Sequence, residues 1–370
     1  MIKSKAPRVA VIGAGVVGLA AANALRRAGA EVRCYEKATP GQAESIGLTR
    51  IFRQAHGDPE LVRLAIQARE GWRIWERRYG RRLLGEEGLI VTGDALAPAW
   101  ERALREADAP YRSLTPMEVT DHLPISRPSP TAALWDPSGG ALRARRTVDL
   151  LRQDCAGCIV HGDVVELTTT ETRVGIRTTD EAWACDEALV TAGIDTPGLA
   201  AQVGVHVPVK LTRHSRFTFA PRLPPVVGAL ACWIDDSGSY GDRLSAYALP
   251  VGTTGRYAVG VSQGGEDFPA RVDADEVSRL TLDMARRYVQ AALPGLEPEP
   301  VDEVRCTYNQ VGVQEGDGFG VQRSRAVTIL YGNNLFKFAP LLGELLSRAV
   351  LQRDAPAAFR VGARLESWGL

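Results

Sequence analysis

The feature that most constrains how this chain can fold is a glycine-rich turn close to its start. Residues 8–12 form a short apolar run, and Gly13, Gly15 and Gly18 follow it in the spacing G-x-G-x-x-G. The run suits a buried parallel strand. Gly13 permits a tight turn, Gly15 lets the backbone approach a pyrophosphate, and Gly18 lets a helix pack closely on the strand. The stretch therefore predicts the opening βα unit of a dinucleotide-binding domain, with phosphate at the helix N-terminus.

An acidic residue downstream supports this interpretation. The helix is expected to run to about Gly29, and residues 31–35 alternate into a second strand that ends at Glu36, 18 positions after Gly18. At about this spacing a carboxylate accepts hydrogen bonds from an adenosine ribose. Because the carboxylate disfavours a 2′-phosphate, FAD or NAD fits better than NADP. A glycine turn in an unrelated α/β protein is the alternative, and the full order of strand, turn, helix, strand and acid argues against it.

Composition excludes several classes of protein. The 370 residues carry 44 basic and 44 acidic side chains, so nothing indicates nucleic acid as a partner. No apolar run reaches the roughly 20 residues of a membrane helix, and residues 1–7 leave no space for a signal peptide. We therefore expect a soluble, cytoplasmic protein. Cys155 and Cys158 form one C-x-x-C pair without the further ligands of a zinc site, so we expect buried thiols and no metal.

The rest of the chain predicts two domains. Asp58 and Pro59 can begin a helix that ends at Gly80, with two tryptophans on its core face. Residues 123–141 are rich in Pro, Ser and Gly and predict a connection between domains. Residues 208–300 combine strands with one long helix, which indicates an α+β domain on an antiparallel sheet. The expected fold is α/β plus α+β: a Rossmann-like domain (1–85, 145–210 and 301–370) with a discontinuous substrate domain (86–144 and 211–300).

Four motifs give the chain a family resemblance over nearly its whole length. They are residues 13–18 with Glu36, residues 49–57 (TRIFRQAHG), residues 305–308 (RCTY) and residues 336–338 (FKF). The first is shared by many nucleotide-binding proteins, and the other three are more specific. The chain resembles the FAD-dependent glycine/D-amino acid oxidase (DAO) family, in particular its monomeric sarcosine oxidase and N-methyltryptophan oxidase branch.

The resemblance implies that FAD binds in an extended form. The cofactor-binding positions that it implies are Gly13, Gly15, Val17, Gly18, Glu36, Lys37, Ser45, Thr49, Arg50, Val165, Gly193, Cys306, Gly332, Asn334, Leu335, Phe336 and Lys337. Cys306 matches the cysteine that attaches the flavin covalently in the family, and a thioether there anchors the ring and raises its potential. A buried, unreacted cysteine on a strand is the alternative.

The same resemblance suggests how a substrate is held. Arg53 and Lys337 match positions that bind a substrate carboxylate, the first through a bidentate guanidinium fork and the second as a point charge. Arg50 resembles an arginine beside the flavin, where positive charge stabilises the reduced anionic ring. Tyr247 resembles an active-site tyrosine facing the substrate. Surface ion pairs for the cations, and a half-buried sheet position for the tyrosine, are the alternatives.

Several positions depart from the family pattern. Ala258 stands where a lysine activates oxygen, and Ser262 where a histidine lines the substrate cavity. Arg256 lies two residues before Ala258 and shares its strand face, so it is one possible source of the missing charge. Residues 333–335 replace small glycines and a histidine near the flavin edge. These changes argue against sarcosine as the substrate and against fast reaction with oxygen.

The sequence thus predicts a two-electron oxidation of the C–N bond of a carboxylate-bearing amine to an imine. The expected acceptor is O2, giving H2O2, in a specialised biosynthetic pathway. A flavin-dependent amino acid dehydrogenase, an NAD(P)H-dependent flavin hydroxylase and a non-catalytic flavin-binding protein remain as alternatives. The expected partner is a small amino or imino acid, with no nucleic acid or membrane, and the expected state is a monomer.

Overall fold

The computed structural model divides into two compact units. It describes residues 6–223, 230–241, 243–252, 254–311, 318–353 and 359–360. Unit 1 consists of Met1–Ile46, Arg146–Leu211 and Tyr308–Leu370, and unit 2 of Gly47–Arg145 and Thr212–Thr307. Residues 47–85 belong to unit 2 in this division.

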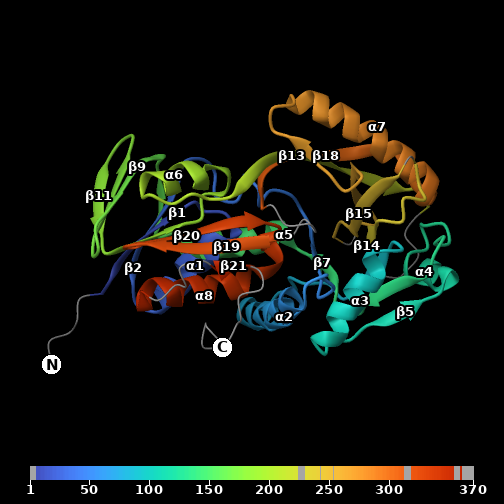
Figure 1. The fold of residues 1–370 in the computed structure, drawn as a ribbon, viewed down its shortest axis with the longest axis horizontal. Helices are drawn as coiled ribbons and strands as arrows, with labels where there is room; N and C mark the ends of the chain where they lie inside the picture. Colours follow the sequence, from blue (N-terminus) through green and yellow to red (C-terminus); the bar gives the residue numbers. More distant parts are fainter. Residues whose placement is uncertain are drawn as a thin grey trace. The chain divides into compact units, whose positions relative to one another are not determined.

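Unit 1 is built on a seven-stranded sheet with the order β21-β19-β20-β12-β1-β2-β8 (Figure 1). Its strands are β1 (Arg8–Ile12), β2 (Glu31–Glu36), β8 (Ile159–His161), β12 (Glu187–Val190), β19 (Gly318–Ser324), β20 (Val327–Asn333) and β21 (Phe359–Arg360). Five of them, from β20 to β8, run parallel, and β19 pairs antiparallel with β20. This is the doubly wound arrangement that the glycine motif predicts.

Helices and a small sheet cover the two faces of this sheet (Figure 1). Helices α1 (Val16–Arg27) and α8 (Ala339–Gln352) pack so closely that a Cβ on Gly343 would lie 2.8 Å from that of Ala20. The opposite face carries α6 (Thr196–Gln202) and the antiparallel strands β9 (Val164–Thr169), β10 (Val174–Thr178) and β11 (Ala182–Cys185). One buried cluster joins Ile12 and Val190 of the large sheet to Leu167 and Ile176 of the small one. Helix α5 (Ala144–Cys155) precedes β8.

Unit 2 is built on a nine-stranded sheet in which β17-β13-β16-β15-β14-β4-β6-β5 follow one another and β18 pairs with β13. Its strands are β4 (Leu89–Thr92), β5 (Arg112–Leu114), β6 (Ala133–Asp136), β13 (Val209–Pro221), β14 (Cys232–Asp235), β15 (Leu244–Pro250), β16 (Tyr257–Gln263), β17 (Phe268–Pro269) and β18 (Leu296–Val311). β14 and β4 pair in parallel. β3 (Arg50–Phe52) and β7 (Gly140–Leu142) form a separate antiparallel pair.

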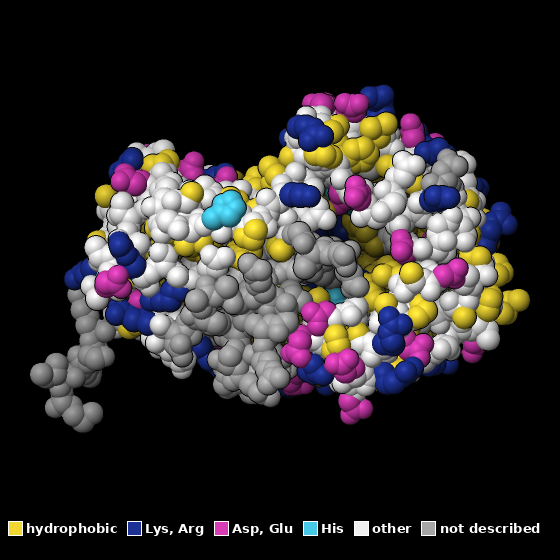
Figure 2. Space-filling model, viewed as in Figure 1, with side chains coloured by type: hydrophobic (Ala, Val, Ile, Leu, Met, Phe, Trp, Pro, Cys, Tyr) yellow, Lys and Arg dark blue, Asp and Glu magenta, His cyan; other side chains and the backbone are white. Residues whose placement is uncertain are grey.

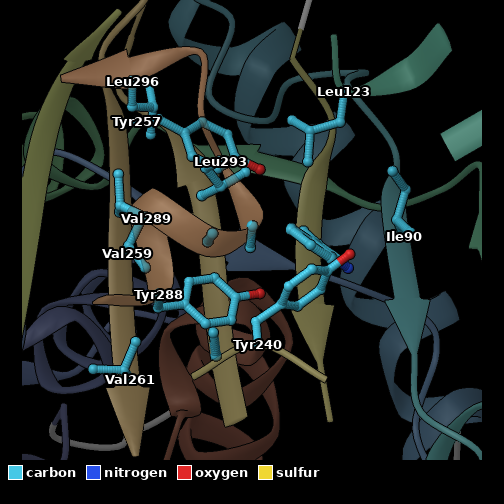
Figure 3. Close-up of a cluster of buried hydrophobic side chains, with 14 of the residues drawn as sticks. Ile90, Leu123, Tyr240, Tyr257, Val259, Val261, Tyr288, Val289, Leu293 and Leu296 are labelled. Carbon is cyan, nitrogen blue, oxygen red and sulfur yellow. The ribbon is translucent and has the colours of Figure 1, made fainter. Parts of the chain in front are cut away.

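The two faces of the nine-stranded sheet carry different layers. Helix α7 (Ala274–Ala292) covers one face, where Tyr288 and Val289 pack against Val259 and Val261 of β16 (Figure 3). Residues of alternate register on the same strands, such as Ala258, pack on the other face with side chains of α2 (Pro59–Tyr79) and α3 (Leu96–Glu106). This alternation follows from the period of two along a strand. Helix α4 (Pro116–His122) is short.

Local sequence signals are confirmed in α2. The Asp58 carboxylate accepts the backbone N–H of Glu60 at 2.8 Å, and Gly80 ends the helix in the left-handed conformation. Trp72 and Trp75 are buried, as their helical spacing predicts. The predicted connection at residues 123–141 is wrong, because β6 lies inside the sheet of unit 2 between β4 and β5. Its four residues are all buried, and turn-forming residues around them obscured the strand.

The surface charges are mixed, as the equal numbers of basic and acidic residues lead us to expect. On the face drawn in Figure 2, basic and acidic side chains are interspersed. Within the described residues, no helix has the length and apolar character needed to cross a membrane. None of the six cysteines forms a disulfide; Cys155 and Cys158 are buried, and Cys306 is partly buried.

Candidate functional site

The glycine turn in unit 1 has the close packing that a phosphate cradle needs. Gly13 has φ +97°, and a Cβ there would lie 2.4 Å from the Thr191 carbonyl oxygen. A Cβ on Gly18 would lie 1.9 Å from the Gly13 carbonyl oxygen, so α1 reaches β1 only because position 18 is glycine. Gly15 is the N-cap of α1 and supplies no side-chain cap. Val17 is buried in the first turn.

Side chains around the turn fix its backbone. The Glu36 carboxylate, at the end of β2, accepts the backbone N–H groups of Ala14 and Ala38 at 2.9 and 3.0 Å. The buried Ser45 hydroxyl accepts the N–H of Val16 at 3.0 Å. Lys37 forms an exposed ion pair with Asp195, and that hydrogen bond raises the pKa of Lys37.

Further predicted positions lie at the carboxyl ends of the parallel strands of unit 1. Gly193 follows β12 and begins a 3₁₀ turn (Gly193–Asp195), and its carbonyl accepts the Asn309 amide at 2.7 Å. Gly332 is in β20 with φ +149°. Asn334 takes the left-handed conformation before a 3₁₀ helix (Leu335–Phe338) that packs near α1. In that turn Leu335 is partly buried, whereas Phe336 and Lys337 are buried. Val165 is not at such an end: it is the second residue of β9 in the small antiparallel sheet, and its side chain is exposed.

The residues of unit 1 fit the adenosine diphosphate part of FAD. The N-terminus of α1 can face a pyrophosphate, because the glycines of the turn carry no side chains of their own and the helix dipole favours anions. Glu36 stands at the end of the second parallel strand, where a carboxylate can accept ribose hydroxyls. Residues 13–18, 36 and 45 could therefore hold this part of the cofactor.

Unit 2 contains a cluster of arginines around Thr49. The Thr49 carbonyl accepts Nη1 of Arg50 at 2.9 Å and Nη1 of Arg216 at 3.2 Å. The Thr49 hydroxyl donates to the Pro250 carbonyl at 3.1 Å. Burial, and after it the charge of Arg216, lowers the pKa of Arg50 to about 10. Two adjacent guanidinium groups make this place favourable for an anion.

Arg53 directly follows β3 in the same unit. Its guanidinium carbon is 4.3 Å from the centroid of a Trp100 ring, and only 8% of the residue is exposed. The buried Asp136 carboxylate accepts the backbone N–H groups of Gln54 and Ala55 at 2.7 and 3.0 Å. Stacking on Trp100 orients the flat guanidinium, whose edge carries the N–H donors that suit a carboxylate.

Tyr247 lies on β15 among these cations. Its hydroxyl is 2.6 Å from Nε2 of His214 on β13. Burial raises the pKa of Tyr247, and the charges of Arg216 and Arg50 act against that rise. Cys306, on β18, is near enough for its charge to act on the pKa of both Arg50 and Tyr247. Unit 2 thus brings together Thr49, Arg50, Tyr247 and Cys306, as well as residues that the sequence did not single out.

The positions that depart from the family pattern are also defined. Ala258 is buried on β16 and pairs with Leu249 and Thr218 on the neighbouring strands. Ser262 is partly buried near the end of the same strand. Arg256 is exposed before β16 begins, whereas Arg216 is buried on the adjacent strand. Arg216 is therefore a better source of buried positive charge than Arg256.

Sequence reasoning missed His214, Arg216 and also Asp267, whose carboxylate lies 3.1 Å from Nδ1 of His214. One signal was available: residues 212–219 alternate, with Phe217 and Phe219 in the core beneath α7 and the polar His214 and Arg216 on the opposite face. Without knowledge of which face carries the site, that alternation indicates a strand and no more.

The fold has close relatives among solved structures. NikD, described as an unusual amino acid oxidase essential for nikkomycin biosynthesis, superposes with a TM-score of 0.83 at 19% identity, covering 99% of this chain and 97% of that one. Glycine oxidase from Geobacillus kaustophilus gives 0.77 at 21% identity, covering 95% and 96%. L-proline dehydrogenase from P. horikoshii gives 0.79 at 17% identity, covering 95% of each chain. No curated protein sequence matches the chain.

The family assignment comes from the sequence itself. The family model described as FAD dependent oxidoreductase (DAO) matches residues 8–349. That range includes the glycine turn of unit 1, the arginine cluster of unit 2 and most of helix α8. The chain therefore belongs to the DAO family of FAD-dependent oxidoreductases.

Proposed function

We propose that this protein oxidises the C–N bond of a carboxylate-bearing amine, such as an N-alkyl or cyclic amino acid, to the corresponding imine. FAD, when bound, supplies the two-electron acceptor for this chemistry. The solved relatives that are named for amino acid, glycine and proline oxidation support the substrate class.

The observation that carries the proposal is the cationic and aromatic cluster of unit 2. Arg53 and Arg216 are 8% and 6% exposed, and Arg50 lies beside Arg216. A guanidinium fork binds a carboxylate through two parallel hydrogen bonds, so Arg53 could make a bidentate contact with the carboxylate of the substrate. A role of Lys337 in binding the substrate carboxylate is proposed from the family resemblance of residues 336–338 alone.

Arg50 and Arg216 have a different proposed role. Burial, and after it the charge of Arg216, lowers the pKa of Arg50, and an anion beside the two guanidinium groups would favour their charged forms. Negative charge that accumulates on the reduced cofactor would have this effect. Arg216 would thereby provide positive charge in a chain where Ala258 replaces the family's lysine.

For the electron acceptor we propose O2, with H2O2 as the product, in a specialised biosynthetic oxidation. The substitution at Ala258 keeps a dehydrogenase as the second candidate. Stopped-flow mixing of the reduced protein with air-saturated buffer separates the two. Reoxidation of the flavin by O2 within seconds supports an oxidase. Reoxidation that takes many minutes with O2 but is fast with an artificial dye supports a dehydrogenase. Rapid bleaching by NADPH would instead indicate a hydroxylase.

We also propose that Cys306 attaches the flavin covalently. Its partial burial beside Arg50 and Tyr247 supports this role. A denaturing gel of the wild type should show a fluorescent protein band, and Cys306→Ser should lose it. The buried Cys155→Ser is the matched control and should keep the band. Fluorescence that runs only at the dye front in the wild type contradicts covalent attachment.

The experiment that tests the function is an anaerobic screen of N-methyl, cyclic and aromatic amino acids for bleaching of the flavin absorbance near 450 nm. At least one amine with a free carboxylate should reduce the flavin, and its carboxamide should not. Arg53→Met should raise the amine concentration needed for half-saturation about 10-fold to 100-fold, because one charged hydrogen-bonded pair is lost. Arg73→Met, on the exposed side of α2, is the control. A yellow protein that no amine reduces would indicate a non-catalytic flavoprotein.

A further inference from the structure

Three side chains of unit 2 form a continuous hydrogen-bonded chain. The Tyr247 hydroxyl is 2.6 Å from Nε2 of His214, and Nδ1 of His214 is 3.1 Å from Oδ1 of Asp267. The two rings lie 5.4 Å apart between centroids at 34°. They come from separate elements: His214 from β13, Tyr247 from β15, and Asp267 from the residue before β17.

A glycine between the two strands allows this contact. In the sheet, β16 separates β13 from β15, and Gly260 of β16 pairs with Arg216 on one side and with Tyr247 on the other. A Cβ on Gly260 would lie 2.4 Å from the Tyr247 ring and 2.7 Å from its oxygen. The ring therefore lies across the backbone of Gly260, which is how the phenol reaches a residue two strands away.

The chemistry of Asp267, at one end of the three hydrogen-bonded side chains, determines the direction of each hydrogen bond. The Asp267 carboxylate, with 18% of its side chain exposed, can only accept, so Nδ1 of the 8% exposed His214 side chain carries the proton. In the neutral ring Nε2 is then an acceptor, and Tyr247 donates to it. The phenolic oxygen of Tyr247 keeps lone pairs that can accept a proton from a group other than His214 and Asp267.

We propose that Tyr247, His214 and Asp267 form a proton relay that deprotonates the ammonium group of the substrate; this inference rests on the proposed function. The N–H bond of the substrate ammonium breaks as its proton passes to the Tyr247 oxygen. The phenolic proton passes at the same time to Nε2 of His214. The products are a neutral amine, a neutral tyrosine and an imidazolium paired with Asp267, and no electrons move. The amine must be neutral before its C–N bond can lose two electrons.

The electrostatics favour a relay over a tyrosine that acts alone. Because burial raises the pKa of Tyr247, a phenolate is disfavoured and the phenolic proton has to move on when another arrives. The charged and titratable groups that act on Tyr247 are Arg216 on β13, Arg50 on β3, Cys306 on β18 and Asp267. The nearby arginines oppose a new positive charge on His214, and Asp267 offsets it. Tyr247 is the catalytic residue here, and the other two are positioning residues.

The hydrogen-bond chain can be tested without a substrate. Nitrogen-15 NMR of the labelled flavoprotein, which has five histidines, reports the tautomer of each ring, and His214→Gln assigns the signal. At pH 8 we expect His214 to carry its proton on Nδ1. In Asp267→Asn the amide can donate to Nδ1, so the tautomer should change to Nε2–H. A wild-type ring protonated on Nε2 at pH 8 would overturn the proposal.

The proton transfer is tested by the pH dependence of anaerobic flavin reduction, with the most active amine of the screen as the probe. In the wild type the rate should fall at low pH, because an imidazolium at His214 can no longer accept a proton. In His214→Gln this acid limb should move to the pKa of the amine itself, and the rate at the wild-type optimum should drop on the order of 100-fold. The exposed His206→Gln in unit 1 is the control and should keep the wild-type profile.

The outcomes separate the relay from the function on which it rests. A His214→Gln enzyme that is reduced with the wild-type pH profile overturns the relay and leaves the proposed function intact. A screen in which no amine reduces the flavin overturns the proposed function and the proton transfer together, whatever the NMR spectra show. Asp267→Asn provides a second variant if His214→Gln does not fold.

Discussion

Replacement of Gly260 by alanine gives the sharpest test of the geometry in unit 2. The new Cβ would lie 2.4 Å from the Tyr247 ring, whereas carbon atoms in normal contact are about 3.5 Å apart. The ring must therefore move by about 1 Å. The contact from Tyr247 to His214 is 2.6 Å, so a shift of this size directed away from His214 lengthens it to roughly 3.6 Å, beyond the range of a hydrogen bond.

Gly260→Ala should lower both the stability of the protein and the rate of flavin reduction, and the two effects can be measured separately. Overpacking of a close contact in a sheet costs about 1–3 kcal/mol, and urea unfolding of the flavoprotein should show a loss of that size. The rate of anaerobic flavin reduction should fall on the order of 100-fold, as for loss of the proton acceptor. In a Tyr247→Phe background, Gly260→Ala should reduce stability again but should not slow the reaction further, because the phenol is already absent.

Controls make the result interpretable. Gly198→Ala, in α6, is the matched glycine substitution because a Cβ there meets nothing within 4 Å. It should leave both stability and rate close to the wild type. If Gly260→Ala keeps the wild-type rate and stability, then the ring does not depend on the space above Gly260 and the reasoning is refuted.

Two further predictions concern unit 1. Burial raises the pKa of Glu44 to about 7, and the charge of Asp195 adds to that rise. Because the carboxyl group ionises at a lower pH in the unfolded state than in the folded state, the free energy of unfolding should fall by at most about 3 kcal/mol between pH 4.5 and 7. Urea unfolding at pH 5 and pH 8 should show that Glu44→Gln removes this fall, and an unchanged difference would contradict the assignment. Gly18→Ala places a Cβ 1.9 Å from the Gly13 carbonyl oxygen, so it should lower the free energy of unfolding by about 3 kcal/mol. It should also abolish flavin binding, measured as the ratio of absorbance at 450 and 280 nm. Flavin bound at the wild-type ratio would mean that α1 can move away from β1 without loss of binding.

The sequence predicted best those features that depend on neighbours along the chain. The turn from Gly13 to Gly18 and the caps of α2 each depend on a few consecutive residues, whose backbone preferences act locally. The α/β plus α+β class followed from the change of pattern between segments. The strand within residues 123–141 was missed because a run of four residues among Pro, Ser and Gly has no local signal that outweighs the turn formers.

The candidate site was only partly predictable for a related reason. Arg50, Arg53 and Tyr247 were found by resemblance, and the structure places Arg50 and Tyr247 with Arg216 and His214, which no motif marks. The contact between His214 and Tyr247 joins residues 33 positions apart, and that between His214 and Asp267 joins residues 53 apart. Such pairs depend on strand order and register, which hydrophobic periodicity does not specify. The covalent role of Cys306 and the role of Lys337 stay predictions.

The parallel pairing of β4 with β14 has a consequence for biogenesis. Leu89 pairs with Cys232, so a ribosome that has just made β4 must add about 140 more residues before the partner strand exists. At the usual rate of synthesis this takes roughly 7–30 s. During that interval the nascent polypeptide exposes the apolar side chains of β4 and β6 and an unpaired strand edge, a state that is prone to aggregation and that chaperones protect.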